Sequence, residues 1–166
     1  MKKFLVMLML ATMILSTGCG DKVEDVKHEA ASEIVNEAPT MNTVDEKFSL
    51  GGISPGMSFD EAKKILGEPT SQHDDDEFTF ANGVMIDVEG GIVEEIKIRQ
   101  AGVKTSQGVE VGMMEYAIGE FCGAADVIDK DDDGEVDYEY YSGDKKSKIV
   151  YTAQNDLIIE IKCSLK

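Results

Sequence analysis

One segment of this 166-residue chain carries the residue types and spacing that could bind a hard metal ion. Oxygen-bearing side chains recur there at alternate positions, and Gly134 among them permits a sharp turn. The candidate ligands are Asp129, Asp131, Asp133, Glu135 and Asp137, with a backbone carbonyl from Glu135 and carboxylates from the rest. Strands rather than helices are expected to flank the segment. The sequence leaves two interpretations open, a calcium loop between strands and a solvated acidic connection.

Two cysteines in the second half of the chain, Cys122 and Cys163, could form a disulfide bond. Cys122 is expected on the inner face of a helix, and Cys163 on the inner face of the last strand. A disulfide requires that the two Cα atoms lie within about 7 Å of each other. The alternative is a pair of buried thiols that pack as small apolar residues.

The sequence shows no pattern typical of a catalyst. His28 and His73 are its histidines, and neither has a serine or cysteine nucleophile in a suitable setting. The sequence contains no phosphate-binding glycine loop and no Cys-x-x-Cys pair. We therefore expect a protein that is not an enzyme and requires no cofactor, with calcium as the candidate ion.

The elements that must position these residues follow from an internal repeat. Residues 52–69 align without a gap with residues 108–125, and the two copies share three glycines and a methionine. In both copies a segment with helical spacing precedes strands of alternating apolar residues. The sequence thus predicts an α+β fold of two tandem units, 48–102 and 103–166. Each unit would be a short helix packed on a three-stranded, or slightly larger, antiparallel meander sheet.

The first unit has the clearer local signals. Ser58 and Glu61 have the spacing of a capping box, Gly67 can end the helix, and Pro69 prevents its continuation. An Asn82-Gly83 pair is typical of a two-residue hairpin turn. The predicted strands are 77–81, 84–88 and 92–99 in the first unit, and 136–141, 148–153 and 157–164 in the second.

The N-terminus carries signals of export. Two lysines precede an apolar run, residues 4–15, that is too short to span a bilayer but suits a secretory signal peptide. The residues that follow, Leu15-Ser16-Thr17-Gly18-Cys19, resemble the bacterial lipobox. That resemblance implies a signal peptide over 1–18, fatty acyl chains such as palmitate on Cys19, and a lipidated, flexible tether over 19–47. An ordinary secretory signal, with Cys19 as a plain thiol, is the alternative.

These signals predict where the protein is found and which partners it excludes. Two or three acyl chains hold a protein stably on a membrane. We therefore expect it in the bacterial cell envelope, lipid-anchored through Cys19 and facing outside the cytoplasm. The chain has 33 acidic and 16 basic residues, and a net charge of −17. Nucleic-acid binding needs a basic face, so nucleic acid is excluded as a partner.

The segment from Gly56 to Pro69 resembles the pattern of the SmpA/OmlA (BamE-like) lipoproteins, which is Gly-Met, a capped short helix and Leu-Gly-x-Pro. Two such units in tandem are similar to the arrangement in β-lactamase inhibitory protein. The resemblance implies a membrane-anchored module that binds a protein partner or assists envelope assembly; it does not identify the partner. A calcium-dependent structural or adhesion module of the cell surface, and an inhibitor of an extracellular enzyme, are the alternatives.

Overall fold

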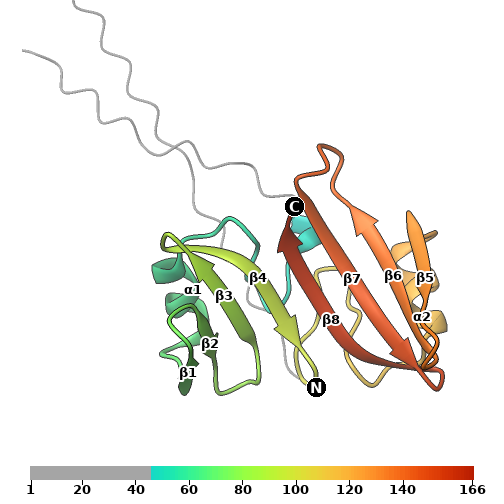
Figure 1. Cartoon of the computed structure of the whole chain (residues 1–166), viewed down its shortest axis with the longest axis horizontal. Coiled ribbons are helices and arrows are strands. Elements are labelled where there is room, and N and C mark those ends of the chain that lie inside the picture. Colours follow the sequence, from blue (N-terminus) through green and yellow to red (C-terminus); the bar gives the residue numbers. More distant parts are fainter. Residues whose placement is uncertain (1–45) are drawn as a thin grey trace, which may run out of the picture. The chain divides into compact units, whose positions relative to one another are not determined.

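The structure is a computed structural model, and it describes residues 46–166 (Figure 1). The predicted signal peptide, Cys19 and nearly all of the predicted tether lie outside the described residues. No helix within the described part of the chain is long and apolar enough to cross a membrane.

The described chain contains two short helices and eight strands, preceded by one turn of 3₁₀ helix, η1 (Glu46–Phe48). The helices are α1 (Phe59–Leu66) and α2 (Tyr116–Cys122). The strands are β1 (Ser71–His73), β2 (Glu77–Thr79), β3 (Met85–Glu89), β4 (Ile92–Ile98), β5 (Val127–Lys130), β6 (Glu135–Tyr141), β7 (Ser147–Gln154) and β8 (Leu157–Leu165). The six predicted strands are present with ends that shift by one or two residues, whereas β1 and β5 were missed.

All eight strands form one antiparallel sheet in the order β1-β2-β3-β4-β8-β7-β6-β5. The predicted α+β fold of two separate helix-on-sheet units was therefore wrong, and the fold is predominantly β. Each helix is followed by a four-stranded meander, and the two meanders join where β4 pairs with β8. This pairing has a physical reason, because two separate sheets would each leave the backbone of a long apolar strand unpaired at an edge.

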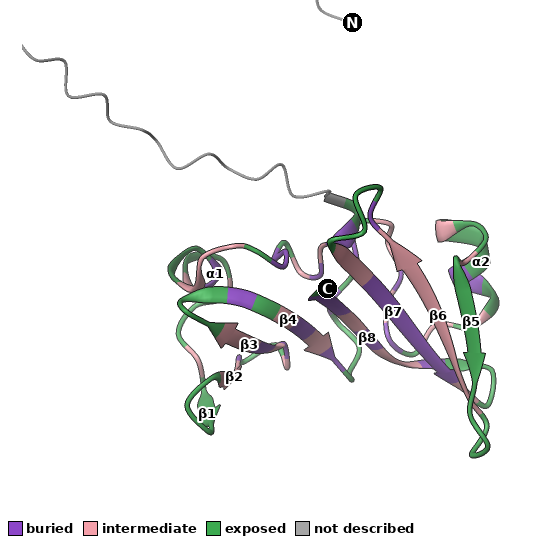
Figure 2. Ribbon diagram, turned by 45° about the horizontal axis from the view of Figure 1, so that its top comes forward, coloured by how far each residue is buried: buried purple, intermediate pink, exposed green. Residues whose placement is uncertain are grey.

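The core runs through this junction on the inner face of the sheet. Ile96 lies opposite Cys163 and Ile98 lies opposite Ile161, and all four are fully buried. In Figure 2 the buried segments continue from β4 across β8 into β7. The two halves of the chain therefore share one apolar core.

The signals for the start and end of the first helix are confirmed, and Gly67 ends α1 as expected. The Ser58 side chain accepts a hydrogen bond from the backbone N–H of Glu61, and the Glu61 carboxylate accepts one from the backbone N–H of Ser58.

The predicted two-residue turn at Asn82-Gly83 was wrong in its length. The N–H of Phe80 donates to the carbonyl of Val84 at 2.9 Å and only Gly83 of the predicted pair has a positive φ, so the loop has three residues, 81–83. A two-residue turn with positive φ at both positions instead joins β7 to β8, at Asn155 and Asp156.

The shared core predicts that the two halves unfold together. All five tyrosines lie in the second half of the chain, so tyrosine fluorescence reports that half, whereas far-UV circular dichroism reports the whole sheet. We expect the two signals to coincide during urea unfolding. Truncating the buried Ile161 to alanine should lower the free energy of unfolding by about 2–5 kcal/mol and shift both curves equally. Two separate transitions would contradict a shared core.

Candidate functional site: a hollow beside the second helix

Three backbone hydrogen bonds place α2 on the sheet. The N–H of Gly112 donates to the carbonyl of Ile158 at 2.8 Å, and the N–H of Ile158 donates back to Met113 at 2.9 Å. The N–H of Glu115 donates to the carbonyl of Asp156 at 2.9 Å. These bonds fix the start of α2 against the turn between β7 and β8.

The first half of the chain uses the same three bonds. They run from Gly56 to Val93, from Val93 to Met57, and from Phe59 to Gly91, at 2.8–2.9 Å. The sheet register agrees, because each half has a bulge at the corresponding place, between Asp87 and Val88 and between Thr152 and Ala153. Residues of the two halves can therefore be compared position by position. The matched pairs at the start of each helix and on the strands beside it are Phe59 with Glu115, Asp60 with Tyr116, Lys63 with Gly119, Phe78 with Tyr138, and Gly91 with Asp156.

In the first half of the chain, aromatic side chains fill the corner between the start of α1 and strand β2. The rings of Phe59 and Phe78 contact each other with centroids 4.4 Å apart. The ammonium group of Lys63 lies 5.0 Å from the centre of the Phe59 ring, and it also pairs with Asp60 at 3.0 Å. The first half thus places one of its own cations over the aromatic pair.

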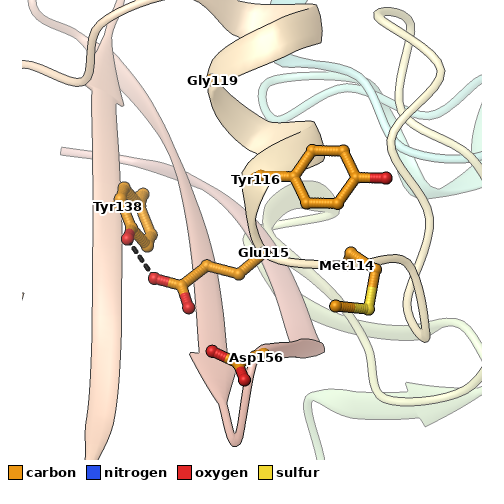
Figure 3. A pocket seen from close by; sticks show the side chains of 6 residues that line it. All are labelled: Met114, Glu115, Tyr116, Gly119, Tyr138 and Asp156. Atoms are coloured by element: carbon orange, nitrogen blue, oxygen red, sulfur yellow. Dashed lines mark hydrogen bonds between the residues drawn. The ribbon is translucent and has the colours of Figure 1, made fainter.

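The matching corner of the second half is open. Its hollow has a volume of about 430 Å³. Figure 3 shows the residues that line it, Met114, Glu115, Tyr116, Gly119, Tyr138 and Asp156. A Cβ atom added at Gly119 would meet no atom within 4 Å. At the two positions whose side chains fill the corner in the first half, Phe59 and Lys63, the second half has Glu115 and Gly119, which leave this space open.

The hollow combines negative charge with an aromatic wall. The Tyr138 hydroxyl donates a hydrogen bond to the Glu115 carboxylate (Figure 3). Burial and the bond to Glu115 raise the pKa of Tyr138 to about 12, so the phenol remains a donor at neutral pH. Glu115 is also the N-cap residue of α2, yet its side chain makes no capping bond with the helix. Its carboxylate lies in the hollow with that of Asp156, and no basic residue lines the hollow.

Exposed apolar side chains gather around the same helix. Met114 is 44% exposed and Tyr116 is 66% exposed at the rim of the hollow. The others in this part of the chain are Phe121 on α2, Val127 and Ile128 on β5, and Leu157 at the start of β8. Exposed apolar surface of this kind, rimmed by polar residues, is typical of sites that contact another molecule.

A second hollow of about 440 Å³ lies against the end of α2. Its wall includes Phe121, Cys122, Tyr140 and Tyr151. The Cys122 thiol donates a hydrogen bond to the Tyr151 hydroxyl at 3.4 Å. Burial raises the pKa of Cys122, so this thiol is a poor nucleophile at neutral pH.

The predicted calcium ligands separate into two groups. Asp129 on β5 and Asp137 on β6 are paired across the hairpin, and Asp137 accepts a hydrogen bond from Thr152 at 2.6 Å. Carboxylate oxygens of Asp131, Asp133 and Glu135 lie within 4.8 Å of one another at the hairpin tip. The carbonyl of Glu135, which we expected as a ligand, accepts the N–H of Asp131 at 2.9 Å.

The predicted disulfide is not formed in the structure, where Cys122 and Cys163 are free thiols. Cys163 is fully buried on β8, and burial raises the pKa of its thiol. The redox state of the pair stays a prediction.

Sequence reasoning missed the hollow itself. The gap-free alignment of the two copies already pairs Phe59 with Glu115 and Lys63 with Gly119, which was the available signal. Tyr138 and Asp156 lie beyond the aligned segment, so only the sheet register brings them to the same corner.

Comparison with known proteins finds no matching family model and no matching curated protein. Among solved structures, the chain is similar to the crystal structure of a DUF4309 family protein (YjgB) from Bacillus subtilis, with 12% sequence identity and a TM-score of 0.47. The match covers 66% of this chain and 78% of that chain. A likeness of this degree supports no conclusion about function.

If the hairpin tip binds calcium, the ion should stabilise the protein. The pKa of Glu135 is raised by burial and by the charges of Asp133, Asp137 and Asp131, and a cation would offset this repulsion. A ligand at 100 times its dissociation constant adds about 2.7 kcal/mol to the free energy of unfolding. We expect a higher melting temperature in millimolar calcium than in EDTA at fixed ionic strength.

A matched pair of variants makes this test specific. Neutralising Asp131 and Asp133 to asparagine should abolish the calcium effect. The same change at Asp74 and Asp75, in the exposed turn between β1 and β2, should leave it intact. An equal melting temperature in calcium and EDTA would exclude the site.

The number of free thiols shows whether Cys122 and Cys163 are bridged. A disulfide between Cys122 and Cys163 closes a loop of about 40 residues, which stabilises the fold by roughly 3–4 kcal/mol in the chain-entropy account. If the bridge is present, we expect no titratable thiol in denatured, unreduced protein comprising residues 20–166. Two titratable thiols per chain would refute it.

Proposed function

We propose that this chain is a lipid-anchored protein of the bacterial cell envelope that binds a protein partner through the surface around α2, and that it is not a catalyst. One observation carries the proposal. The two halves share one backbone framework, yet the corner that Phe59, Lys63 and Phe78 close in the first half is open and apolar-rimmed in the second.

The chemistry of the hollow agrees with binding rather than catalysis. His73, the histidine among the described residues, is exposed in the first half of the chain and does not line the hollow. The raised pKa of Tyr138 removes it as a general base at neutral pH. The lining therefore offers recognition through charge, hydrogen bonding and aromatic contact.

Anchoring is the other half of the proposal, and the sequence supports it. Acyl chains on Cys19 would hold the protein on the membrane, and residues 19–47 would separate the lipid from the folded part. The resemblance to BamE-like lipoproteins implies the same arrangement, with a role in binding or envelope assembly. Inhibition of an extracellular enzyme would be one form of such binding.

A calcium-dependent surface module is the second candidate. It is favoured by the convergence of Asp131, Asp133 and Glu135 at the tip of the β5–β6 hairpin. The exposure of the two aspartates weakens it, because acidic side chains in solvent need no ion to offset their charge.

Lipid anchoring predicts how the protein partitions between phases. The full-length protein made in bacteria should enter the detergent-rich phase of a Triton X-114 extraction, because buried acyl chains favour an apolar environment. The Cys19→Ala variant should remain in the aqueous phase. Equal partitioning of the two proteins would contradict anchoring through Cys19.

The binding surface can be tested by site-specific photo-crosslinking in cells of the source bacterium. A benzophenone amino acid at position 116, beside the hollow, should give a discrete adduct of higher mass. The same amino acid at position 65 is the control, because Ile65 is similarly exposed on α1. Identical adducts from both positions, or none from position 116, would count against a partner at this surface.

A further inference from the structure

We propose that the hollow beside α2 receives the side chain of an arginine from the partner protein, with its guanidinium group at the carboxylates of Glu115 and Asp156. The proposal rests on the protein-binding function above and names the chemistry that this surface recognises. It draws on charge, on shape, and on the comparison of the two halves of the chain.

The negative charge of the hollow has no counterpart within the described residues. Several other carboxylates have a basic neighbour; the pairs include Glu160 with Arg99, Glu110 with Lys104, and Glu139 with Lys148. Most of the described carboxylates form no ion pair with a lysine or arginine of residues 46–166, and Glu115 and Asp156 are among them. The backbone bond between these two residues keeps them adjacent, and Figure 3 shows their side chains in the same hollow. The site is therefore complementary to a cation from outside.

Tyr138 prepares the hollow for this cation. Its hydroxyl holds one oxygen of the Glu115 carboxylate, Oε1, which orients the group and leaves Oε2 for another donor. Asp156 is held in the tight turn between β7 and β8 by its positive φ of 65° and by its carbonyl, which accepts the N–H of Glu115. The Glu115 carboxylate and the Asp156 backbone are thus positioned before a ligand arrives, which lowers the entropic cost of binding.

The shape and lining favour a side chain over a metal ion. About 430 Å³ is far more space than a bare ion needs, and the two carboxylates are not part of any three-residue metal-ligand group in the described chain. Met114 and Tyr116 offer apolar surface that a methylene stem can cover.

Arginine fits better than lysine for two reasons. Its planar group can donate to two carboxylates at once, and it stacks on aromatic faces such as those of Tyr116 and Tyr138. Lysine offers a compact charge without this planar geometry.

The first half of the chain shows that a cation suits this corner of the framework. There, Lys63 lies over the Phe59 ring and pairs with Asp60. In the second half the matching lysine position is Gly119, which has open space in front of it. Compared with the first half, the second half has no lysine at this position, has Tyr138 as an aromatic wall, and has carboxylates at the positions of Phe59 and Gly91. An arginine from a partner would restore the arrangement that the first half builds from its own residues.

The test is a nuclear magnetic resonance titration of the full-length, ¹⁵N-labelled protein in detergent micelles. The probe is Nα-acetyl-arginine N-methylamide, and its neutral isostere, the citrulline analogue, is the chemical control. We expect saturable shifts of the backbone signals of Tyr116, Gly119 and Leu157 with the arginine probe, and none with the citrulline probe. Equal shifts with both, or shifts spread evenly over the acidic surface, would overturn the proposal. Tighter binding of the lysine analogue would overturn the choice of arginine.

Three variants assign the binding to the hollow. Glu115→Gln keeps an acceptor for Tyr138 but removes the charge, and it should weaken binding by about fivefold. Glu120→Gln removes an equally charged, exposed residue of the same helix that does not line the hollow, and it should have no effect. Gly119→Lys should supply an internal cation and abolish binding. Equal effects of the two glutamine variants, or unchanged binding by Gly119→Lys, would contradict the assignment.

The outcome separates this inference from the proposed function. If position 116 gives a specific crosslinked adduct and the arginine probe does not bind, the partner uses other chemistry and only this inference fails. If the probe binds and position 116 gives no adduct in cells, the hollow has the proposed chemistry and the proposed function fails.

Discussion

The pairing of β4 with β8 is the interaction on which the rest of the described structure depends. It joins two antiparallel meanders into one sheet and brings Ile96, Ile98, Ile161 and Cys163 into a single core. Helices of seven and eight residues are not stable alone in water, so α1 and α2 form only because this core accepts their apolar faces. The same core contains Leu50, whose segment bridges to Thr105 at the start of the second half.

The two halves of the molecule share one backbone framework and differ in the corner beside the start of each helix. Backbone hydrogen bonds and matched bulges hold both helices in the same way, and these bonds do not depend on side chains. The corner beside the start of each helix is therefore free to differ. In one half it is closed by an aromatic stack, and in the other it is an acidic hollow.

For recognition of a ligand, the surroundings of a carboxylate matter more than the number of carboxylates on the surface. The chain is acidic throughout, and Asp131 and Asp133 at the tip of the β5–β6 hairpin face solvent, where water and salt screen them. Glu115 and Asp156 instead share a hollow with apolar and aromatic walls. Glu115 is half-buried and Asp156 is exposed, so the two sites do not differ in how far their carboxylates are removed from water. The hollow is the better candidate for recognition because aromatic and apolar surface adjoins its carboxylates.

The amino-acid sequence by itself determined the short-range structure of this protein. The capping box of Ser58 and Glu61 and six of the strands were predictable, because they depend on residues a few positions apart. The tertiary structure decided the rest. Nothing local in β4 or β8 specifies that they pair with each other, and the short strands β1 and β5 lack the alternation that identifies a strand, so their partners define them. The hollow combines positions 114–119, 138 and 156, and only the long-range register of the sheet brings such distant residues together.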